Sequence, residues 1–159
     1  MATNTVTTVI LIRHANRDVP PAGTPDDPGP SLNDKGIARS RKLIHVLSTA
    51  GIQAVYTSHF TRAKMSAKPF LVAHPDLPAV RLDAAIELKD HILTHHAGKT
   101  VLVVGHSNTV PELIKLLGGP SLPIIDDCEF DNLFVLFKHS ATKASVSKLK
   151  YGEPTSAPC

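Results

Sequence analysis

The sequence predicts an α/β protein whose central sheet is mostly parallel and carries an antiparallel edge. Two observations support this fold class. Strand-like apolar runs alternate with segments of helical spacing along most of the chain, and two further strand-like runs follow each other near its end. The length of 159 residues fits a single domain, residues 1–159. A hydrophobic content of 42% supplies a core, and a charged content of 19% is too low for a disordered polyelectrolyte.

The first part of the chain predicts one strand–loop–helix unit. Residues 6–12 are β-branched and apolar, as is typical of a strand covered on both faces. Residues 18–30 are rich in Pro, Gly and Asp and form a loop, because they interrupt both kinds of periodicity. A helix capped by Asn33 or Asp34 follows and ends near Gly51. Its apolar face comprises Ile37, Leu43, Ile44 and Leu47.

The same alternation continues through the middle of the chain. Residues 54–56 indicate a short strand, and residues 62–72 indicate a helix that stops before Pro75. Residues 83–96 have helical spacing, and residues 100–104 form the clearest buried strand. Successive units of this kind build a parallel sheet through right-handed crossovers.

The last part of the chain predicts a short helix and a pair of strands. Thr109 and Glu112 have the spacing of a capping box at the start of that helix. Residues 133–137 and 145–149 indicate two strands joined by a tight polar link, and they account for the antiparallel edge. Residues 152–159 are expected to form a loose tail.

Composition argues against several classes of partner. Lys and Arg number 17 against 14 Asp and Glu, which permits an anionic ligand but gives no dense basic stripe for DNA. Aromatic residues make up 4% and Trp is absent, so we expect no nucleic-acid partner that stacks bases. No apolar run approaches the ~20 residues of a membrane span, and residues 1–8 lack the pattern of a secretory signal. We therefore expect no membrane partner and a cytoplasmic location. Cys128 and Cys159 are too few for a disulfide framework and are expected to be free thiols.

Polar side chains follow three of the predicted strands. Arg13 and His14 come after the first strand, and Ser58 and Arg62 come after the second. His106 comes directly after the buried strand that precedes the short helix. Ligands of open α/β sheets bind beyond the carboxyl ends of the strands. Arginine supplies paired, permanently charged donors for a tetrahedral dianion, so these residues predict a phosphate-binding pocket.

The segments around these residues resemble the histidine phosphatase superfamily, and its phosphoglycerate mutase-like branch in particular. The matching segments are residues 11–15 (Leu-Ile-Arg-His-Ala), 32–36, 56–63 and 104–107 (Val-Gly-His-Ser). They occur in the family's order and lie within residues 9 to about 118. The resemblance implies a three-layer αβα sandwich, the phosphoglycerate mutase-like fold.

The resemblance also implies a reaction. His14 would attack phosphorus in line and form a phosphohistidine, which water then hydrolyses. Arg13, Arg62 and His106 match the positions at which the family clamps phosphate. The family's chemistry needs no metal and no cofactor, so we expect neither.

The remaining expected site residues concern the substrate and the proton donor. We expect Asn16 and Ser107 to contact the substrate. Relatives usually carry a carboxylic acid that protonates the leaving group. Ser107 occupies one of the two positions where that acid is found. In the other region, before the strand that leads to His106, the acids are Asp76, Asp83, Glu87 and Asp90, and none of them matches the family's pattern. We take Asp83 as the candidate there and Asp18, on the Pro-rich loop, as a second candidate. A missing acid would favour leaving groups that need no proton, such as those of phosphohistidine or aryl phosphates.

His91, His95 and His96 are spaced for one helix face and suggest a zinc site. No Cys or acid completes a ligand set beside them, so we expect no metal there.

Three functions stay open at this point. The first is a phosphatase that hydrolyses phosphomonoesters or protein phosphohistidine and releases inorganic phosphate, with a small phosphorylated substrate or a phosphoprotein as partner. The second is a phosphate-reading binding module that lacks turnover because it lacks the acid. The third is a phosphoglycerate mutase. It is disfavoured because the short chain has little room for lid elements that retain phosphate.

Overall fold

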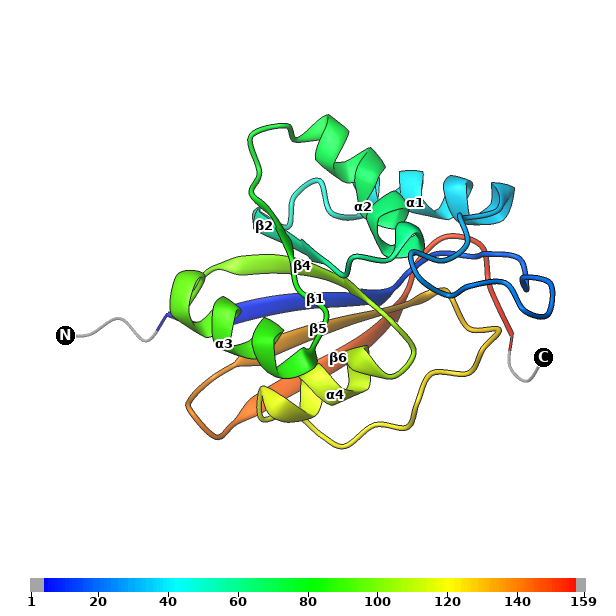
Figure 1. Ribbon diagram of the computed structural model, residues 1–159. Helices are drawn as coiled ribbons and strands as arrows, with labels where there is room; N and C mark the ends of the chain where they lie inside the picture. Colours follow the sequence, from blue (N-terminus) through cyan, green and yellow to red (C-terminus); the bar gives the residue numbers. More distant parts are fainter. Residues whose placement is uncertain (1–4, 157–159) are drawn as a thin grey trace.

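A six-stranded sheet lies between two layers of helices in the computed structural model, which describes residues 5–156 (Figure 1). The helices are α1 (Asp34–Val46), α2 (Thr61–Ala73), α3 (Ala85–His95) and α4 (Thr109–Leu116). The strands are β1 (Thr7–Arg13), β2 (Ile52–Thr57), β3 (Ala79–Arg81), β4 (Thr100–Gly105), β5 (Asn132–Lys138) and β6 (Ala144–Lys150). The expected α/β class and its layered arrangement are confirmed.

The strand order is β3-β2-β4-β1-β5-β6. β1, β4, β2 and β3 pair in parallel, whereas β5 is antiparallel to both β1 and β6. The sequence patterns predict every strand except β3, which has three residues and pairs only with β2. So short a strand carries no readable periodicity.

The pairing of β1 with β4 positions the carboxyl ends of the two central strands. Arg13 is the register partner of Gly105, so both strands end at the same level of the sheet. His14 and His106 are the next residues along each strand. Two segments that lie far apart in the sequence therefore present their polar side chains side by side.

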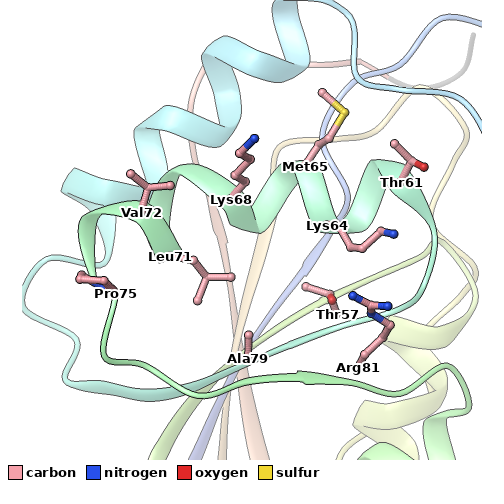
Figure 2. A pocket seen from close by; sticks show the side chains of 10 residues that line it. All are labelled: Thr57, Thr61, Lys64, Met65, Lys68, Leu71, Val72, Pro75, Ala79 and Arg81. Atoms are coloured by element: carbon pink, nitrogen blue, oxygen red, sulfur yellow. The ribbon is translucent and has the colours of Figure 1, made fainter.

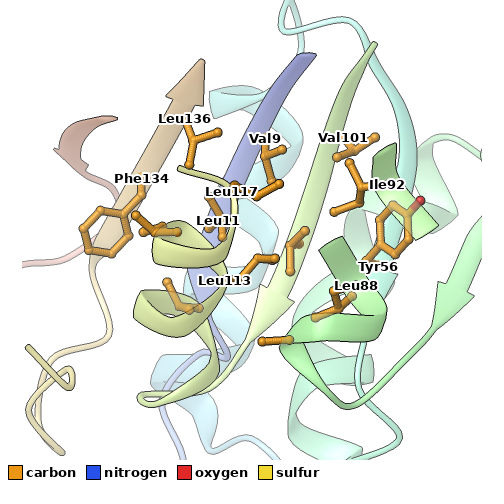
Figure 3. Packing of buried hydrophobic residues seen from close by; sticks show 14 of the residues in the cluster. Val9, Leu11, Tyr56, Leu88, Ile92, Val101, Leu113, Leu117, Phe134 and Leu136 are labelled. Carbon is orange, nitrogen blue, oxygen red and sulfur yellow. The ribbon is translucent and has the colours of Figure 1, made fainter. Parts of the chain in front are cut away.

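The core consists of two clusters, one on each face of the sheet. Val9 and Leu11 of β1 pack on one face with the helices α3 and α4 (Figure 3). Ile10 and Ile12 face the other side and pack with α1 and α2. Successive residues of a strand point to opposite faces, so a strand covered on both faces must be apolar throughout. This explains the unbroken apolar run that predicts β1.

The buried face of helix α1 differs in part from the apolar face expected from the sequence. The side chain of Asn33 accepts a hydrogen bond from the Gly36 amide at 3.0 Å, as expected of a cap. Leu43 is buried, but Ile44 is 37% exposed. Arg39 is buried instead, because its guanidinium binds backbone carbonyls near the end of the chain.

Helix α4 does not use the predicted capping box. Its N-cap residue is Asn108, whose side chain makes no capping hydrogen bond. The hydroxyl of Thr109 accepts a hydrogen bond from the His106 amide at 3.0 Å. Thr109 therefore fixes the turn that carries His106 and leaves the cap unfilled.

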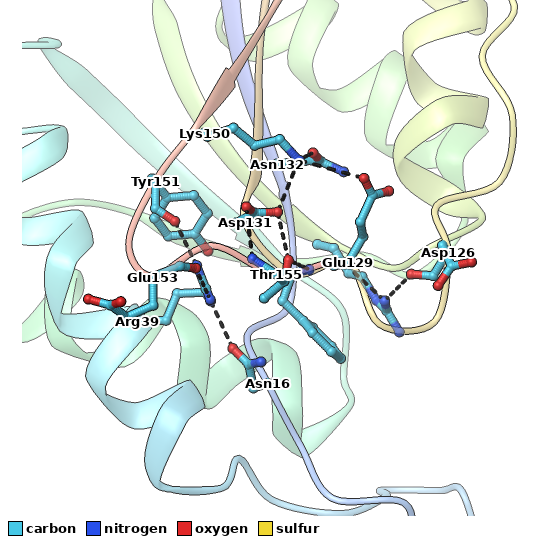
Figure 4. A network of polar contacts seen from close by, with 12 residues as sticks. Asn16, Arg39, Asp126, Glu129, Asp131, Asn132, Lys150, Tyr151, Glu153 and Thr155 are labelled. Atoms are coloured by element: carbon cyan, nitrogen blue, oxygen red, sulfur yellow. Dashed lines mark hydrogen bonds and ion pairs between the residues drawn. The ribbon is translucent and has the colours of Figure 1, made fainter. Parts of the chain in front are cut away.

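The end of the chain is held more firmly than the expected loose tail, residues 152–159. Arg39 donates to the carbonyls of Tyr151 and Glu153, both at 2.6 Å (Figure 4). The Thr155 hydroxyl donates to the buried Asp131 carboxylate at 2.7 Å, and the Thr155 amide donates to the same carboxylate at 3.1 Å. The described part of this segment is thus anchored to the body of the protein, while residues 157–159 lie outside the described residues.

Two further expectations bear on the chain as a whole. Cys128 is disulfide-bonded, so the expectation of a free thiol at this position is wrong. Cys159 lies outside the described residues. Within residues 5–156, no helix has the length and apolar character needed to cross a membrane.

Candidate active site

A cavity of about 280 Å³ lies at the carboxyl end of the sheet, beside the ends of β1 and β4. Its lining includes five of the residues expected from the sequence, namely Arg13, His14, Arg62, His106 and Ser107. Ser58, which the sequence places beside Arg62, also lines it. These side chains come from three strand ends and the start of α2, so the sheet topology alone assembles them.

His14 is held as a neutral imidazole with one ring nitrogen free. Its amide donates to the Gly105 carbonyl at 2.9 Å, and its Nδ1 lies 2.9 Å from the Ala15 carbonyl. Nδ1 must therefore carry the proton, which leaves Nε2 with its lone pair. Burial, followed by the charges of Arg13 and His106, lowers the pKa of His14 to about 2, against the opposing effect of the Ala15 hydrogen bond. An unprotonated Nε2 is the state that a nucleophile requires.

His106 stands next to His14 and is fixed at both its backbone and its ring. The two ring centroids are 5.4 Å apart. The Nε2 of His106 lies 2.7 Å from the Ser58 hydroxyl, and its amide is held by Thr109. Burial, and then the charge of Arg62, lowers the pKa of His106 to about 4. The ring is therefore neutral at physiological pH.

The two arginines flank the histidines, and each packs on a phenylalanine ring. Arg13 lies 4.3 Å from the ring centroid of Phe130, and Arg62 lies 4.4 Å from that of Phe60. The Nη1 of Arg13 donates at 2.9–3.1 Å to three backbone carbonyls, those of Asp126, Asp127 and Glu129. The Nε atoms of both arginines are buried and have no hydrogen-bond partner among the described residues. Both guanidinium groups therefore keep donors for an anion, and unmet buried donors are costly.

A carboxylate from the Pro-rich loop occupies part of this cationic surface. Asp26 pairs with Arg62, with its two oxygens 3.1 and 3.5 Å from the two terminal nitrogens. The start of α2, which carries Arg62, also contacts this loop, because the Thr61 amide donates to the Pro28 carbonyl at 2.9 Å. The Asp26 carboxylate is 65% exposed, so it approaches the buried guanidinium from the solvent side.

The two candidate acids lie in different surroundings. Asp83 lines the cavity and accepts hydrogen bonds from the amide and the Nδ1 of His59, both at 2.8 Å. Partial burial acts to raise the pKa of Asp83, but the bonds from His59 outweigh it and the pKa is lowered. The other ring nitrogen of His59 lies 2.9 Å from Asp27. Asp18 lines a neighbouring hollow and accepts from Asn33 at 3.0 Å. The Asp83 carboxyl is therefore held ionised at neutral pH.

The structure does not bring Asn16 into the cavity. Its side-chain oxygen accepts a hydrogen bond from Arg39 at 2.8 Å and belongs to the polar network at the end of the chain (Figure 4). The loop after His14 is held differently. The Ala15 amide donates to the Ser66 hydroxyl at 2.8 Å, and that hydroxyl donates to the Arg62 carbonyl at 2.7 Å. Ser66 thus ties the His14 loop to the helix that carries Arg62.

Sequence reasoning missed four residues that shape the site: Asp26, Phe60, Phe130 and Ser66. The two phenylalanines come from segments without strand or helix periodicity, and their role depends on the arginines that pack on them. Ser66 lies one helical turn after Arg62, and this spacing was the only available signal.

Two of the histidines singled out in the sequence, His91 and His96, hydrogen-bond to the buried Tyr56. The Tyr56 hydroxyl lies 3.0 Å from the Nδ1 of His91 and 2.6 Å from that of His96. Burial raises the pKa of Tyr56 to about 12, so it stays a phenol that can donate one bond and accept another. Among residues 5–156, no three His, Cys, Asp or Glu side chains are grouped to hold a metal ion.

Comparison with known proteins agrees with this geometry. The family model of the histidine phosphatase superfamily (branch 1) matches residues 9–90, which is more than half of the chain. A protein histidine phosphatase SixA, solved in complex with tungstate, has a TM-score of 0.70 and 19% identity, with 90% of this chain and 96% of that chain covered. No protein of curated function matches the sequence.

Two further solved structures share the fold. A mycobacterial glucosyl-3-phosphoglycerate phosphatase has a TM-score of 0.64 and 12% identity, with 92% of this chain and 98% of that chain covered. A phosphoglycerate mutase from Plasmodium falciparum has a TM-score of 0.56 and 20% identity, with 98% and 96% covered. Identities this low establish a common fold and leave the substrate open.

Proposed function

Because the chain belongs to the histidine phosphatase superfamily, we propose that it is a metal-independent phosphatase in which His14 carries the phosphoryl group. The observation that carries this proposal is the state of His14, whose Nε2 is free while Nδ1 donates to the Ala15 carbonyl. His14 opens into a cavity that it shares with Arg13, Arg62 and His106.

The first chemical step transfers the phosphoryl group to the protein. The Nε2 lone pair of His14 forms a bond to phosphorus as the bond from phosphorus to the leaving group breaks, and the electron pair of that bond goes to the leaving group. The equatorial oxygens are stabilised by donors that are in place before the reaction, above all those of Arg13 and Arg62. Neutral His106 and the Ser58 hydroxyl bond to each other on the same wall of the cavity, so one N–H or O–H of the pair stays free to donate to the phosphoryl group.

The second step returns the protein to its starting state. A water oxygen attacks phosphorus, the bond from phosphorus to His14 breaks, and inorganic phosphate leaves. The Ala15 carbonyl keeps the proton on Nδ1 throughout, so Nε2 is the atom that is phosphorylated and then released.

The surroundings of the carboxylates favour one class of substrate. The candidate acid Asp83 lines the cavity, and its hydrogen bonds from His59 lower its pKa and keep it ionised. A site with no protonated acid acts best on leaving groups that depart without one, which includes the imidazole of phosphohistidine and the anions of aryl phosphates. We therefore favour protein phosphohistidine over alkyl phosphomonoesters as the substrate. The tungstate-bound protein histidine phosphatase of the same fold supports this choice.

Phosphate release from p-nitrophenyl phosphate and from a phosphohistidine peptide tests the proposal. Wild type should turn over both, tungstate should inhibit both, and His14→Ala should lose at least about 10³-fold in kcat, as triad nucleophiles do elsewhere. His45→Ala, at the exposed end of α1, is the matched histidine control and should keep its rate. Tungstate binding without any turnover would establish the binding module instead. Isomerisation of a phosphoglycerate without phosphate release would establish a mutase.

A further inference from the structure

A second, larger hollow of about 600 Å³ lies between α2 and β3, outside the phosphate cavity (Figure 2). We call it the α2–β3 groove. One end is apolar, with Leu71, Pro75 and Ala79, and the other end carries Thr57, Lys64 and Arg81. None of the residues that line the groove is acidic or aromatic.

The alternation of β3 explains why the groove exists. Val80 points to the opposite face of the sheet and packs against the core cluster under α3 and α4. Ala79 and Arg81 must therefore point to the α2 face, where both line the groove. Ala79 is too small to reach the helix above it. The outermost strand is thus left partly uncovered, and Val72 on the facing helix is 70% exposed.

The charge of the groove is one-sided. Lys64, Lys68 and Arg81 line it, and none of them makes an ion pair or side-chain hydrogen bond with another residue of the described chain, 5–156. These cationic side chains have no acidic neighbour and lie beside apolar groove residues. Such a surface is complementary to a ligand that is both acidic and partly apolar. The absence of aromatic side chains from the lining leaves nothing on which nucleic-acid bases could stack.

The strand at the groove also has an open edge. β3 is the last strand on its side of the sheet. The carbonyl of Pro78 and the amide of Leu82 bond to β2, so by alternation the backbone groups of Ala79 and Arg81 point away from the sheet. An extended polypeptide can pair with such an edge through its main chain while its side chains enter the adjacent hollow.

The groove lies next to the phosphate cavity, across one turn of chain. Thr57 and Thr61 line the groove, whereas Ser58, Phe60 and Arg62 line the cavity. The turn between β2 and α2 is therefore the ridge that separates the two hollows. A small phosphate ester would fill only the cavity, but a polypeptide crossing this ridge would reach both.

We propose that the α2–β3 groove binds an acidic, partly apolar segment of a protein substrate in extended form, beside the phosphorylated residue that enters the cavity. The placing of a phosphorylated residue in the cavity rests on the proposed function. The binding of the acidic segment in the groove does not depend on it. The ligand class is an extended polypeptide with alternating acidic and aliphatic side chains. Its carboxylates would pair with Lys64, Lys68 and Arg81, and its aliphatic side chains would cover Leu71 and Ala79.

Binding of unphosphorylated peptides tests the groove without requiring catalysis. The probe is a fluorescein-labelled peptide of four Leu-Glu repeats, and the control probe contains four Leu-Lys repeats; both are measured by fluorescence anisotropy at low salt. Wild type should bind the Leu-Glu peptide and not the Leu-Lys peptide. The double variant Lys64→Glu/Lys68→Glu should bind it roughly tenfold more weakly, because each exposed charge contact is worth a few-fold.

The matched control is Lys35→Glu/Lys42→Glu, which makes the same change in net charge on the exposed part of α1. It should leave peptide binding unchanged. Thermal unfolding of both double variants shows whether each is folded, and Arg81→Glu on the facing strand gives a second, independent reversal. Equal losses from both double variants would overturn the inference, because they would show that net charge alone governs binding. Tighter binding of an oligodeoxynucleotide of equal charge would also overturn it.

The two proposals fail in different ways. Peptide binding at the groove together with no release of phosphate from p-nitrophenyl phosphate would support the groove and contradict the phosphatase. Phosphate release together with no preference between the two peptides would contradict the groove alone.

Discussion

Replacing Asp26 with asparagine should strengthen phosphate binding, although it removes an ion pair. The Asp26 carboxylate lies 3.1 Å from Arg62, on a guanidinium that the proposed reaction needs for the phosphoryl oxygens. A phosphate must displace this carboxylate or share the guanidinium with it. Asp26→Asn keeps the size of the side chain and removes its charge, so the competition disappears.

The magnitude follows from the geometry of the pair. Arg62 is buried, but the Asp26 side chain is 65% exposed, so the pair belongs with solvent-screened contacts worth about 0.2–1 kcal/mol. Releasing Arg62 from it corresponds to roughly 1.4- to 5-fold tighter binding. If the loop stayed in place, the carboxylate and a dianion about 5 Å away would repel by about 1.7 kcal/mol even at the dielectric constant of water. We therefore expect tungstate to bind more tightly to Asp26→Asn, by up to about fivefold if the loop moves aside in wild type and by about 18-fold if the loop stays in place.

Isothermal titration calorimetry with tungstate at low salt measures this change. Asp76→Asn, an exposed acid on the turn after α2, is the control for the loss of one negative charge and should change affinity less than twofold by the same screening argument. Unchanged or weaker tungstate binding by Asp26→Asn would refute the reasoning. It would show that Arg62 does not receive the anion or that Asp26 assists its binding.

Two further predictions concern stability. The pKa of His14 is lowered by burial to about 2 in the folded protein, so below its ordinary value of 6.5 the unfolded chain binds the extra proton and stability falls as the pH falls. Because of this one histidine, the free energy of unfolding measured in urea should be about 1.4 kcal/mol lower at pH 5.5 than at pH 7.5. The variant His14→Ala should lack this contribution. An identical pH dependence of stability in this variant would contradict the lowered pKa of His14. Arg39→Ala should lower the free energy of unfolding by roughly 2–4 kcal/mol, because it leaves the carbonyls of Tyr151 and Glu153 without their charged donor. The exposed neighbour Arg41→Ala should change it by less than about 0.5 kcal/mol, and equal effects would argue against an anchored chain end.

The parts of the fold that could be predicted from the sequence are those in which local pattern and burial agree. β1 and β4 are apolar throughout because helices cover both faces of the sheet, and this makes them readable without any partner. Their ends follow directly, so Arg13, His14 and His106 could be assigned to one edge of the sheet. Arg62 could be added because its helix starts just after the neighbouring strand.

The parts that could not be predicted depend on contacts between distant segments. β3 exists only through its pairing with β2, and its three residues carry no pattern of their own. Asn16 is turned from the cavity by Arg39, and Arg39 is in turn held by carbonyls more than a hundred residues away. The Thr109 hydroxyl serves His106 instead of the helix that it opens. In each case a contact with another residue of the fold decides the structure, and the local sequence pattern does not indicate that contact.

The phosphorylated form of His14 is the species that most directly tests the proposed reaction. Wild type should be mixed with p-nitrophenyl phosphate, quenched in alkali during turnover, digested and analysed by mass spectrometry. The account predicts one phosphoryl group on the peptide that contains His14, stable in alkali and lost in acid, and no such peptide from His14→Ala. Phosphate release with the label on His106, or with no phosphorylated peptide at any quench time, would contradict it.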